Sequence, residues 1–89
     1  MEVRETKIKR LSLRSMRRGI KEMDLILSAF ANKNLSTLPN EDLSLYDQFL
    51  SENDHDLYNW ISGQTEAPEI YGALVQKISK GAHGLTSPN

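Results

Sequence analysis

The chain has 89 residues, enough for one small domain with a single hydrophobic core and little room for a buried catalytic cleft. It contains no cysteine, which excludes disulfides, thiolate nucleophiles and cysteine-ligated zinc sites. The net charge of −1 conceals a division, because residues 1–21 carry eight Lys or Arg and two Glu, a net +6, whereas the remainder carries −7.

The basic first segment is a candidate for steering association with an acidic partner, of which nucleic acid is one kind. A solvated helix face explains the same charges equally well. No apolar stretch approaches the roughly 20 residues that span a bilayer, and the start lacks the apolar core of a secretory signal. We therefore expect an unexported protein without direct membrane insertion.

Apolar residues recur at three- and four-residue steps, and no stretch alternates strictly enough for a strand. This pattern predicts an all-α fold, a compact bundle of five short helices. The first helix is predicted from about Val3 to Met16, with Ile8 and Leu11 one turn apart. Because this apolar stripe is thin, even if Leu13 and Met16 widen it, we expect the helix at the edge of the bundle.

Gly19 interrupts the pattern where the first helix would end, because glycine enters left-handed backbone geometry without steric cost. A second helix is predicted after this turn. Its apolar face would consist of Ile20, Met23, Leu27, Phe30 and Ala31. The polar composition of residues 32–37 then predicts a loop.

The third helix is predicted to begin near Pro39, whose missing N–H suits a first turn, and to end near Glu52. Its predicted buried side chains are Leu43, Tyr46, Phe49 and Leu50. A short fourth helix should follow, capped by Asn53 or Asp54 and ended by Gly63. Its predicted core residues are Leu57, Trp60 and Ile61.

The fifth helix is predicted to begin near Pro68, with Gly72 inside it. Its broad apolar face would contain Ile70, Tyr71, Leu74, Val75 and Ile78. Residues 1–80 are predicted to form a single domain. Residues 81–89 hold two glycines and a proline and are predicted to be a disordered tail.

Catalytic and metal-binding chemistry finds little support in the sequence. His55 lies between Asp54 and Asp56, but the second histidine, His83, falls in the predicted tail, so a metal site has too few ligands. Two aspartates two residues apart project in different directions on a helix, which argues against a paired general acid and base. We therefore predict a protein that is not an enzyme and has no metal site.

The run from Arg17 to Asp24 places cations, a glycine and two carboxylates at the predicted junction between the first two helices. A local explanation is that Gly19 makes a turn and that Glu22 favours the start of the second helix. The alternative is a docking surface, since arginine forks pair with carboxylates and a glycine allows a partner surface to approach closely.

Together with later residues, this run resembles the SdhE family, small assembly factors that promote covalent attachment of FAD to the flavoprotein subunit of succinate dehydrogenase. The resemblance covers roughly Arg10 to Lys80. It rests on the order and spacing of Arg18, Gly19, Glu22, Asp24, Leu27, Phe30, Asp54, Asp56, Leu57, Trp60 and Ile61. Met16, where relatives often have an aromatic residue, and Pro39, where a capping serine is typical, depart from the pattern.

The resemblance implies a non-catalytic maturation factor or chaperone whose Arg17, Arg18, Gly19 and Glu22 engage the flavoprotein subunit. Asp24 would extend this surface or cap a turn. Fumarate reductase supplies a candidate second client. No flavin-binding element is recognisable, so we expect no cofactor held stably by this chain, and FAD attached only to the client.

We expect a monomer in a bacterial cytoplasm, because the basic start leads straight into the family motif and does not read as a separate presequence. Two other functions stay open. A small helical nucleic-acid-binding protein could use the basic first helix, although the later helices are acidic and lack a recognition pattern. An interaction module with an unrelated partner is the second, which co-purification would identify.

Overall fold

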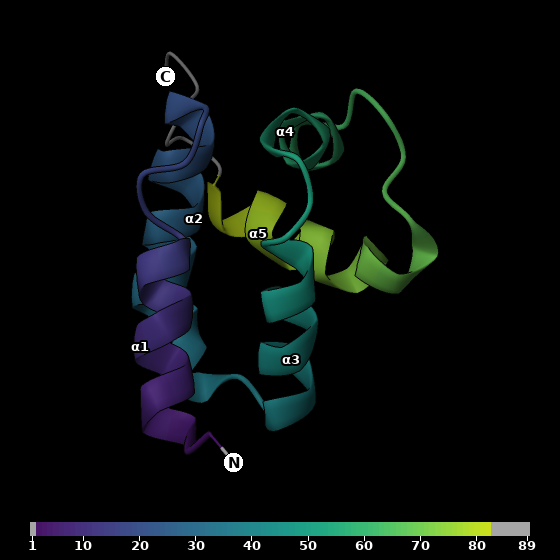
Figure 1. Cartoon of the computed structure of the whole chain (residues 1–89). Coiled ribbons are helices and arrows are strands. Elements are labelled where there is room, and N and C mark those ends of the chain that lie inside the picture. Colours follow the sequence, from purple (N-terminus) through teal and green to yellow (C-terminus); the bar gives the residue numbers. More distant parts are fainter. Residues whose placement is uncertain (1, 83–89) are drawn as a thin grey trace.

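The computed structural model describes residues 2–82 and shows a bundle of α-helices without any strand in that range (Figure 1). The helices are α1 (Arg4–Arg14), α2 (Lys21–Asn34), α3 (Asn40–Phe49), α4 (Asp54–Ser62) and α5 (Gly72–Ala82), with 3-10 turns at Leu35–Thr37 and Glu69–Tyr71. The predicted all-α bundle of five short helices is confirmed. Within residues 2–82, none of these helices has the length and apolar character needed to cross a membrane.

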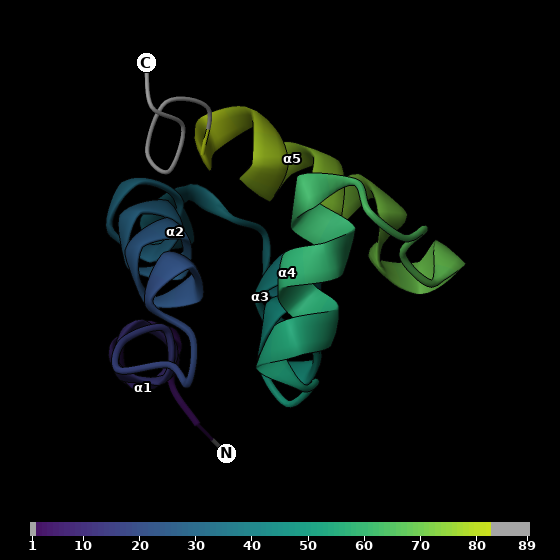
Figure 2. The same cartoon turned by 90° about the horizontal axis from the view of Figure 1, so that it is seen from above.

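Helix α2 packs against several of the other helices. It contacts α1, α4 and α5, and the view from above shows it between α1 and α5 (Figure 2). Its buried side chains are Met23, Ile26, Leu27, Phe30 and Ala31. The predicted face is therefore largely confirmed, with Ile26 added and Ile20 only partly buried. Helix α1 packs on the outer side of α2 and buries one side chain, Leu11, which confirms its predicted place at the edge.

An aromatic cluster joins α3 to the second half of the chain. The Phe49 ring lies 5.2 Å from the Tyr71 ring and 6.2 Å from the Trp60 ring, measured between centroids. The four side chains predicted to be buried on α3, including Tyr46 and Phe49, are all buried. Trp60, predicted as a core residue, is only partly buried and covers the edge of this cluster.

The ends of α4 follow the predicted signals. The Asn53 side chain accepts a hydrogen bond from the His55 backbone N–H at 2.8 Å and so caps the helix. Gly63 ends it with a φ of 83°, in the left-handed region that glycine tolerates. Here local sequence chemistry is sufficient to set both ends of the helix.

The predicted loop over residues 32–37 is wrong. Helix α2 continues to Asn34, and the 3-10 turn follows without a break. Side chains of polar residues support the backbone there, since Thr37 Oγ1 donates to the Asn34 carbonyl oxygen at 3.0 Å. Leu35 and Leu38 are buried, so burial against the rest of the bundle outweighs the weak helix propensity of the polar residues.

Three apolar residues lie outside the core, and one of them, Ile70, was predicted to be buried. Helix α1 ends at Arg14, and Leu13 and Met16 are exposed, so they do not widen its apolar stripe. Ile70 belongs to the 3-10 turn before α5 and is 57 % exposed, because that turn does not continue the register of the α-helix. Gly72 is the first residue of α5 and does not lie inside it.

The predicted tail began at Gly81, but α5 extends to Ala82, so Gly81 and Ala82 are helical. The rest of that prediction, residues 83–89 with His83, lies outside the described residues. The division into a domain of residues 1–80 and a tail stays a prediction.

The cations of the first segment largely face α3. Lys7 donates to Ser44 Oγ at 2.7 Å, Arg10 pairs with Asp47 at 2.8 Å, and Arg14 pairs with the same carboxylate. Arg4 donates to Asn40 Oδ1 at 2.7 Å, at the start of α3. Arg10 and Arg14 thus share one carboxylate, whereas the partners of Lys7 and Arg4 are neutral.

Asp47 makes the fold sensitive to acid. Its hydrogen bond with Arg10, together with the charges of Arg10 and Arg14, lowers the pKa of the Asp47 carboxyl below its ordinary value. A carboxylate with a lowered folded-state pKa stabilises the fold above its unfolded pKa of about 4, and this contribution is lost as the pH falls further. Acid should therefore weaken the contact between α1 and α3.

We expect Asp47→Asn to lower the free energy of unfolding at pH 7 by about 1 kcal/mol, because both ion pairs are partly solvent-exposed. Urea unfolding at pH 7, 5 and 3 should show that the difference between the variant and the wild type shrinks at pH 3. Glu66→Gln, at an exposed loop position, is the control and should change little. A difference that is constant with pH would contradict the assignment.

Candidate functional site

The predicted motif begins in the segment that joins α1 to α2, residues 15–20, which we call the α1–α2 loop. Its first residue, Ser15, is fully buried. The Ser15 hydroxyl donates to the Leu11 carbonyl oxygen at 2.8 Å and lies 2.6 Å from the Tyr46 hydroxyl. Burial raises the pKa of Tyr46 to about 12, so this hydroxyl stays neutral near pH 7. The buried pair anchors the start of the loop to α3.

Arg17 is the loop residue with unusual backbone geometry. Its φ is 54°, and among the described residues it is the one non-glycine residue with a positive φ. The sequence had assigned left-handed geometry to Gly19, which is wrong. For an L-residue this conformation costs about 1–2 kcal/mol, so the surrounding contacts must hold it in place. The side chain of Arg17 is exposed.

Arg18 faces the fold. Its side chain is 13 % exposed, and its Nε donates to Asp54 Oδ1 at 2.8 Å. Its two terminal nitrogens donate to the carbonyl oxygens of Arg14 at 2.8 Å and Leu50 at 3.0 Å. Arg18 therefore joins the ends of α1 and α3 to the start of α4.

Gly19 lies close to the Asp54 carboxylate. Its N–H donates to Asp54 Oδ2 at 2.8 Å, and a Cβ atom built on it would lie 3.1 Å from the same oxygen. That distance is tighter than ordinary van der Waals contact, so a residue with a Cβ atom would push the carboxylate oxygen back by a few tenths of an ångström. The docking role that the resemblance implies for Gly19 stays a prediction, and the structure shows this residue in contact with Asp54.

Glu22 and Asp24 differ in what they contact. Glu22 lies in the first turn of α2 and is exposed, as is its neighbour Lys21. Asp24 is partly buried, and its Oδ1 accepts a hydrogen bond from Ser28 Oγ at 3.1 Å. Asp24 thus supports α2, which favours the local role that the sequence left open for it. We call Arg17, Lys21 and Glu22 the charged surface.

Exposed apolar side chains lie near this charged surface. Leu13 is 71 % exposed, Leu25 48 % and Met16 46 %. Met16 lines a groove between α1 and α2 together with Ser28 and other residues of α2. Sequence reasoning missed these residues as a group, although the position of Leu13 off the Ile8–Leu11 stripe was a usable signal. Apolar side chains beside charged ones are typical of protein interfaces.

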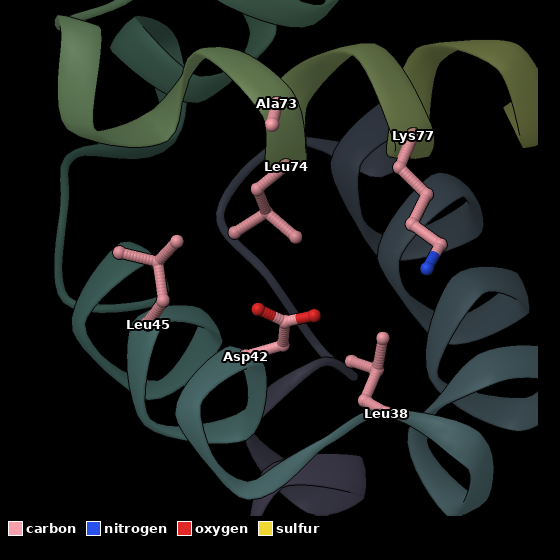
Figure 3. Close-up of a pocket in the computed structure, with 6 residues that line it drawn as sticks. All are labelled: Leu38, Asp42, Leu45, Ala73, Leu74 and Lys77. Carbon is pink, nitrogen blue, oxygen red and sulfur yellow. The ribbon is translucent and has the colours of Figure 1, made fainter.

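A second hollow lies between α3 and α5, away from the loop (Figure 3). The six residues that line it are Leu38, Asp42, Leu45, Ala73, Leu74 and Lys77. Figure 3 shows the Asp42 carboxylate directed from α3 toward Leu74, with leucine side chains on either side. One carboxylate and one ammonium group among apolar side chains do not make a recognisable catalytic set.

Metal binding has no candidate site in the part of the chain that the structure describes. Residues 2–82 contain no group of three or more His, Cys, Asp or Glu placed to hold a metal ion. His55 lies exposed in the first turn of α4, next to the Asn53 cap. The charged surface and the exposed apolar side chains near it are the features of the described residues that remain as a candidate site.

Comparison with known proteins identifies similar sequences. The model of a family described as "Flavinator of succinate dehydrogenase" matches residues 9–82. The chain is 37 % identical over 86 residues to the mitochondrial succinate dehydrogenase assembly factor 2 of Mycosarcoma maydis, covering 97 % of the chain and 36 % of that relative. It is 46 % identical over 81 residues to the factor of the same name from Schizosaccharomyces pombe, covering 89 % and 58 %.

A factor named 2-B from Drosophila mojavensis is 38 % identical over 78 residues, with 85 % of the chain and 50 % of the relative covered. The chain thus spans between about a third and three-fifths of the length of these relatives. Their names place them in mitochondria, so the expectation of a bacterial cytoplasm is wrong. The motif residues indicate the family but carry no information about subcellular localisation, so they could not decide the compartment.

Proposed function

The chain belongs to the family of flavinators of succinate dehydrogenase, and from this premise we propose that it docks on the flavoprotein subunit of that enzyme and promotes covalent attachment of FAD. Its family is one of assembly factors, and we propose that this member acts without catalytic residues of its own. The mitochondrial relatives support a mitochondrial place of action.

The α1–α2 loop and the start of α2 support the docking role. Arg17, Lys21 and Glu22 are exposed and make no ion pair or side-chain hydrogen bond within residues 2–82, so their charges are available to a partner. Leu13, Met16 and Leu25 add exposed apolar area nearby. Charged groups that set orientation beside apolar side chains that supply affinity are the usual composition of an interface.

Arg17 is the single observation that carries the assignment to this surface. Its backbone is held in an unfavourable region while its side chain remains in solvent, so the fold bears a cost that gives no packing in return. A contact with another molecule would explain why arginine and not glycine occupies this position.

The proposed mechanism is positioning. Covalent flavinylation joins a histidine of the client to FAD, and the reacting groups belong to the client and the cofactor. A helper that holds mobile parts of the client so that the flavin and histidine stay aligned lowers the barrier without contributing a reacting group. We expect no stably held FAD on this chain, and the flavoprotein subunit of fumarate reductase is a candidate second client.

Reconstitution tests this function directly. The purified flavoprotein subunit without covalent flavin is incubated with FAD, with and without the chain, then denatured, and the covalently retained flavin fluorescence is measured. We expect the chain to raise the rate of covalent attachment at least about tenfold, which corresponds to a barrier lowered by about 1.4 kcal/mol. An unrelated helical protein of similar size is the control, and an equal rate with and without the chain would overturn the proposal.

A further inference from the structure

Asp54, the first residue of α4, binds two consecutive residues of the α1–α2 loop. Its Oδ1 accepts from Arg18 Nε and its Oδ2 accepts from the Gly19 N–H, both at 2.8 Å. Each carboxylate oxygen therefore has its own donor, and both bonds are charge-assisted. Asp54 lies 35 and 36 residues from its two partners along the chain, so this contact depends on the packing of α4 beside the loop.

The other contacts of Arg18 extend this arrangement to three helices. The guanidinium group reaches the last residue of α1 through the Arg14 carbonyl and the C-terminal end of α3 through the Leu50 carbonyl. We call Asp54, Arg18 and Gly19 the loop clamp. With its side chain 13 % exposed and its three nitrogens engaged, Arg18 has little left to offer a partner.

The clamp lies directly after the strained residue. Arg17 precedes Arg18 and Gly19, whose side chain and N–H are fixed by Asp54, and follows the anchored Ser15 by two residues. Fixing the chain on both sides leaves few backbone conformations for Arg17 and directs its side chain to solvent. A strained conformation persists only when neighbouring contacts determine it in this way.

We propose that Asp54 is a positioning residue for docking: through Arg18 and Gly19 it holds the α1–α2 loop in the shape that presents Arg17 to the partner, ahead of the first turn of α2 with its exposed Glu22. This inference rests on the proposed function. It assigns two roles within the segment from Arg17 to Glu22. Arg18 and Gly19 stabilise the fold through Asp54, whereas Arg17 and Glu22 contact the partner. The charged surface is then prepared before the partner arrives, which avoids an ordering cost on binding.

Positioning has a kinetic signature that distinguishes it from direct contact. If the loop loses its shape, only a fraction of molecules is competent to bind, and the apparent affinity falls by that fraction. The loss then appears chiefly as a lower association rate constant, whereas loss of a contact residue chiefly raises the dissociation rate constant. Hydrogen exchange at the Gly19 amide reports the clamp in the free chain.

The experiment compares Asp54→Ala and Asp54→Asn with Asp56→Ala, which removes a carboxylate from the same first turn of α4 at an exposed position. We expect Asp54→Ala to speed Gly19 amide exchange at least about tenfold while amides of α2 and α3 keep their protection. Binding of the immobilised flavoprotein subunit should weaken at least about tenfold through the association rate. Asp56→Ala should bind as the wild type does.

Asp54→Asn keeps one acceptor oxygen and should fall between the wild type and Asp54→Ala; it carries the test should the alanine variant not fold. Two results in a folded Asp54 variant would overturn the positioning role: an unchanged association rate despite fast Gly19 exchange, or Gly19 exchange as slow as in the wild type. Failure of the wild-type chain to bind the flavoprotein subunit would instead overturn the proposed function itself, so the two failures are distinguishable.

Discussion

Glu22→Lys should reduce binding of the flavoprotein subunit at least about a hundredfold and abolish the acceleration of flavinylation. Glu22 is exposed in the first turn of α2 beside the exposed Lys21, so the change reverses one sign of the charged surface without touching the core. A like-charge contact across an interface costs several kcal/mol, which exceeds a hundredfold in affinity at 1.4 kcal/mol per tenfold. Surface binding kinetics and covalent flavin fluorescence measure the two effects.

Glu41→Lys is a matched control for this change. Glu41 is also exposed and is also the second residue of its helix, α3, which begins at the opposite end of the bundle from the start of α2 (Figure 1). Both variants should lose about 0.3–1 kcal/mol of stability, because a cation at a helix N-terminus opposes the helix dipole. Equal binding by the two variants would contradict the assignment of Glu22 to the interface.

Phe49→Ala should unfold the domain or lower its thermal midpoint by at least about 12 °C. Phe49 is fully buried on α3 and contacts the rings of Tyr46, Trp60 and Tyr71, so its removal leaves a cavity where α3 meets α4 and the turn before α5. Such substitutions cost about 3–5 kcal/mol. A domain of this size has about 5–13 kcal/mol in total, and each kcal/mol moves the midpoint by about 4–8 °C.

Circular dichroism at 222 nm during heating measures this loss. Ile70→Ala is the control, because Ile70 is a large apolar residue that the sequence pattern placed on a buried face and the structure leaves 57 % exposed. It should change the free energy of unfolding by no more than about 0.5 kcal/mol. A large loss for Ile70→Ala, or a small one for Phe49→Ala, would mean that the core is not the one described.

The helices and most of the core could be predicted because their signals are local. The three- and four-residue spacing of apolar residues reports the buried face of a helix, and that face is as predicted on α3 and largely so on α2. Asn53 and Gly63 act through the backbone of their own helix, so the ends of α4 were readable too. The loop predicted over residues 32–37 was wrong, because burial of Leu35 and Leu38 outweighs the polar composition from which that loop was predicted.

The sequence indicated which stretch of the chain forms the candidate site, but not which of its side chains face the fold and which face solvent. A resemblance to a family drew attention to Arg17, Arg18, Gly19 and Glu22, and spacing alone could not separate inward from outward roles. Residues at successive positions carry the same local signal whether they face a partner or the fold. The exposure of Leu13 and Met16 likewise depends on where α1 ends and on what α2 covers.

By itself, then, the amino-acid sequence determined the all-α class, most of the face that α2 and α3 bury, and the family to which the chain is similar. Only the tertiary structure decided that Arg18 pairs with Asp54, that the Gly19 N–H donates to the same carboxylate at 2.8 Å, and that Arg17 takes the left-handed conformation. The physical reason is range: helix periodicity acts over four residues, whereas these contacts join residues about 35 apart and exist only once α4 packs beside the α1–α2 loop.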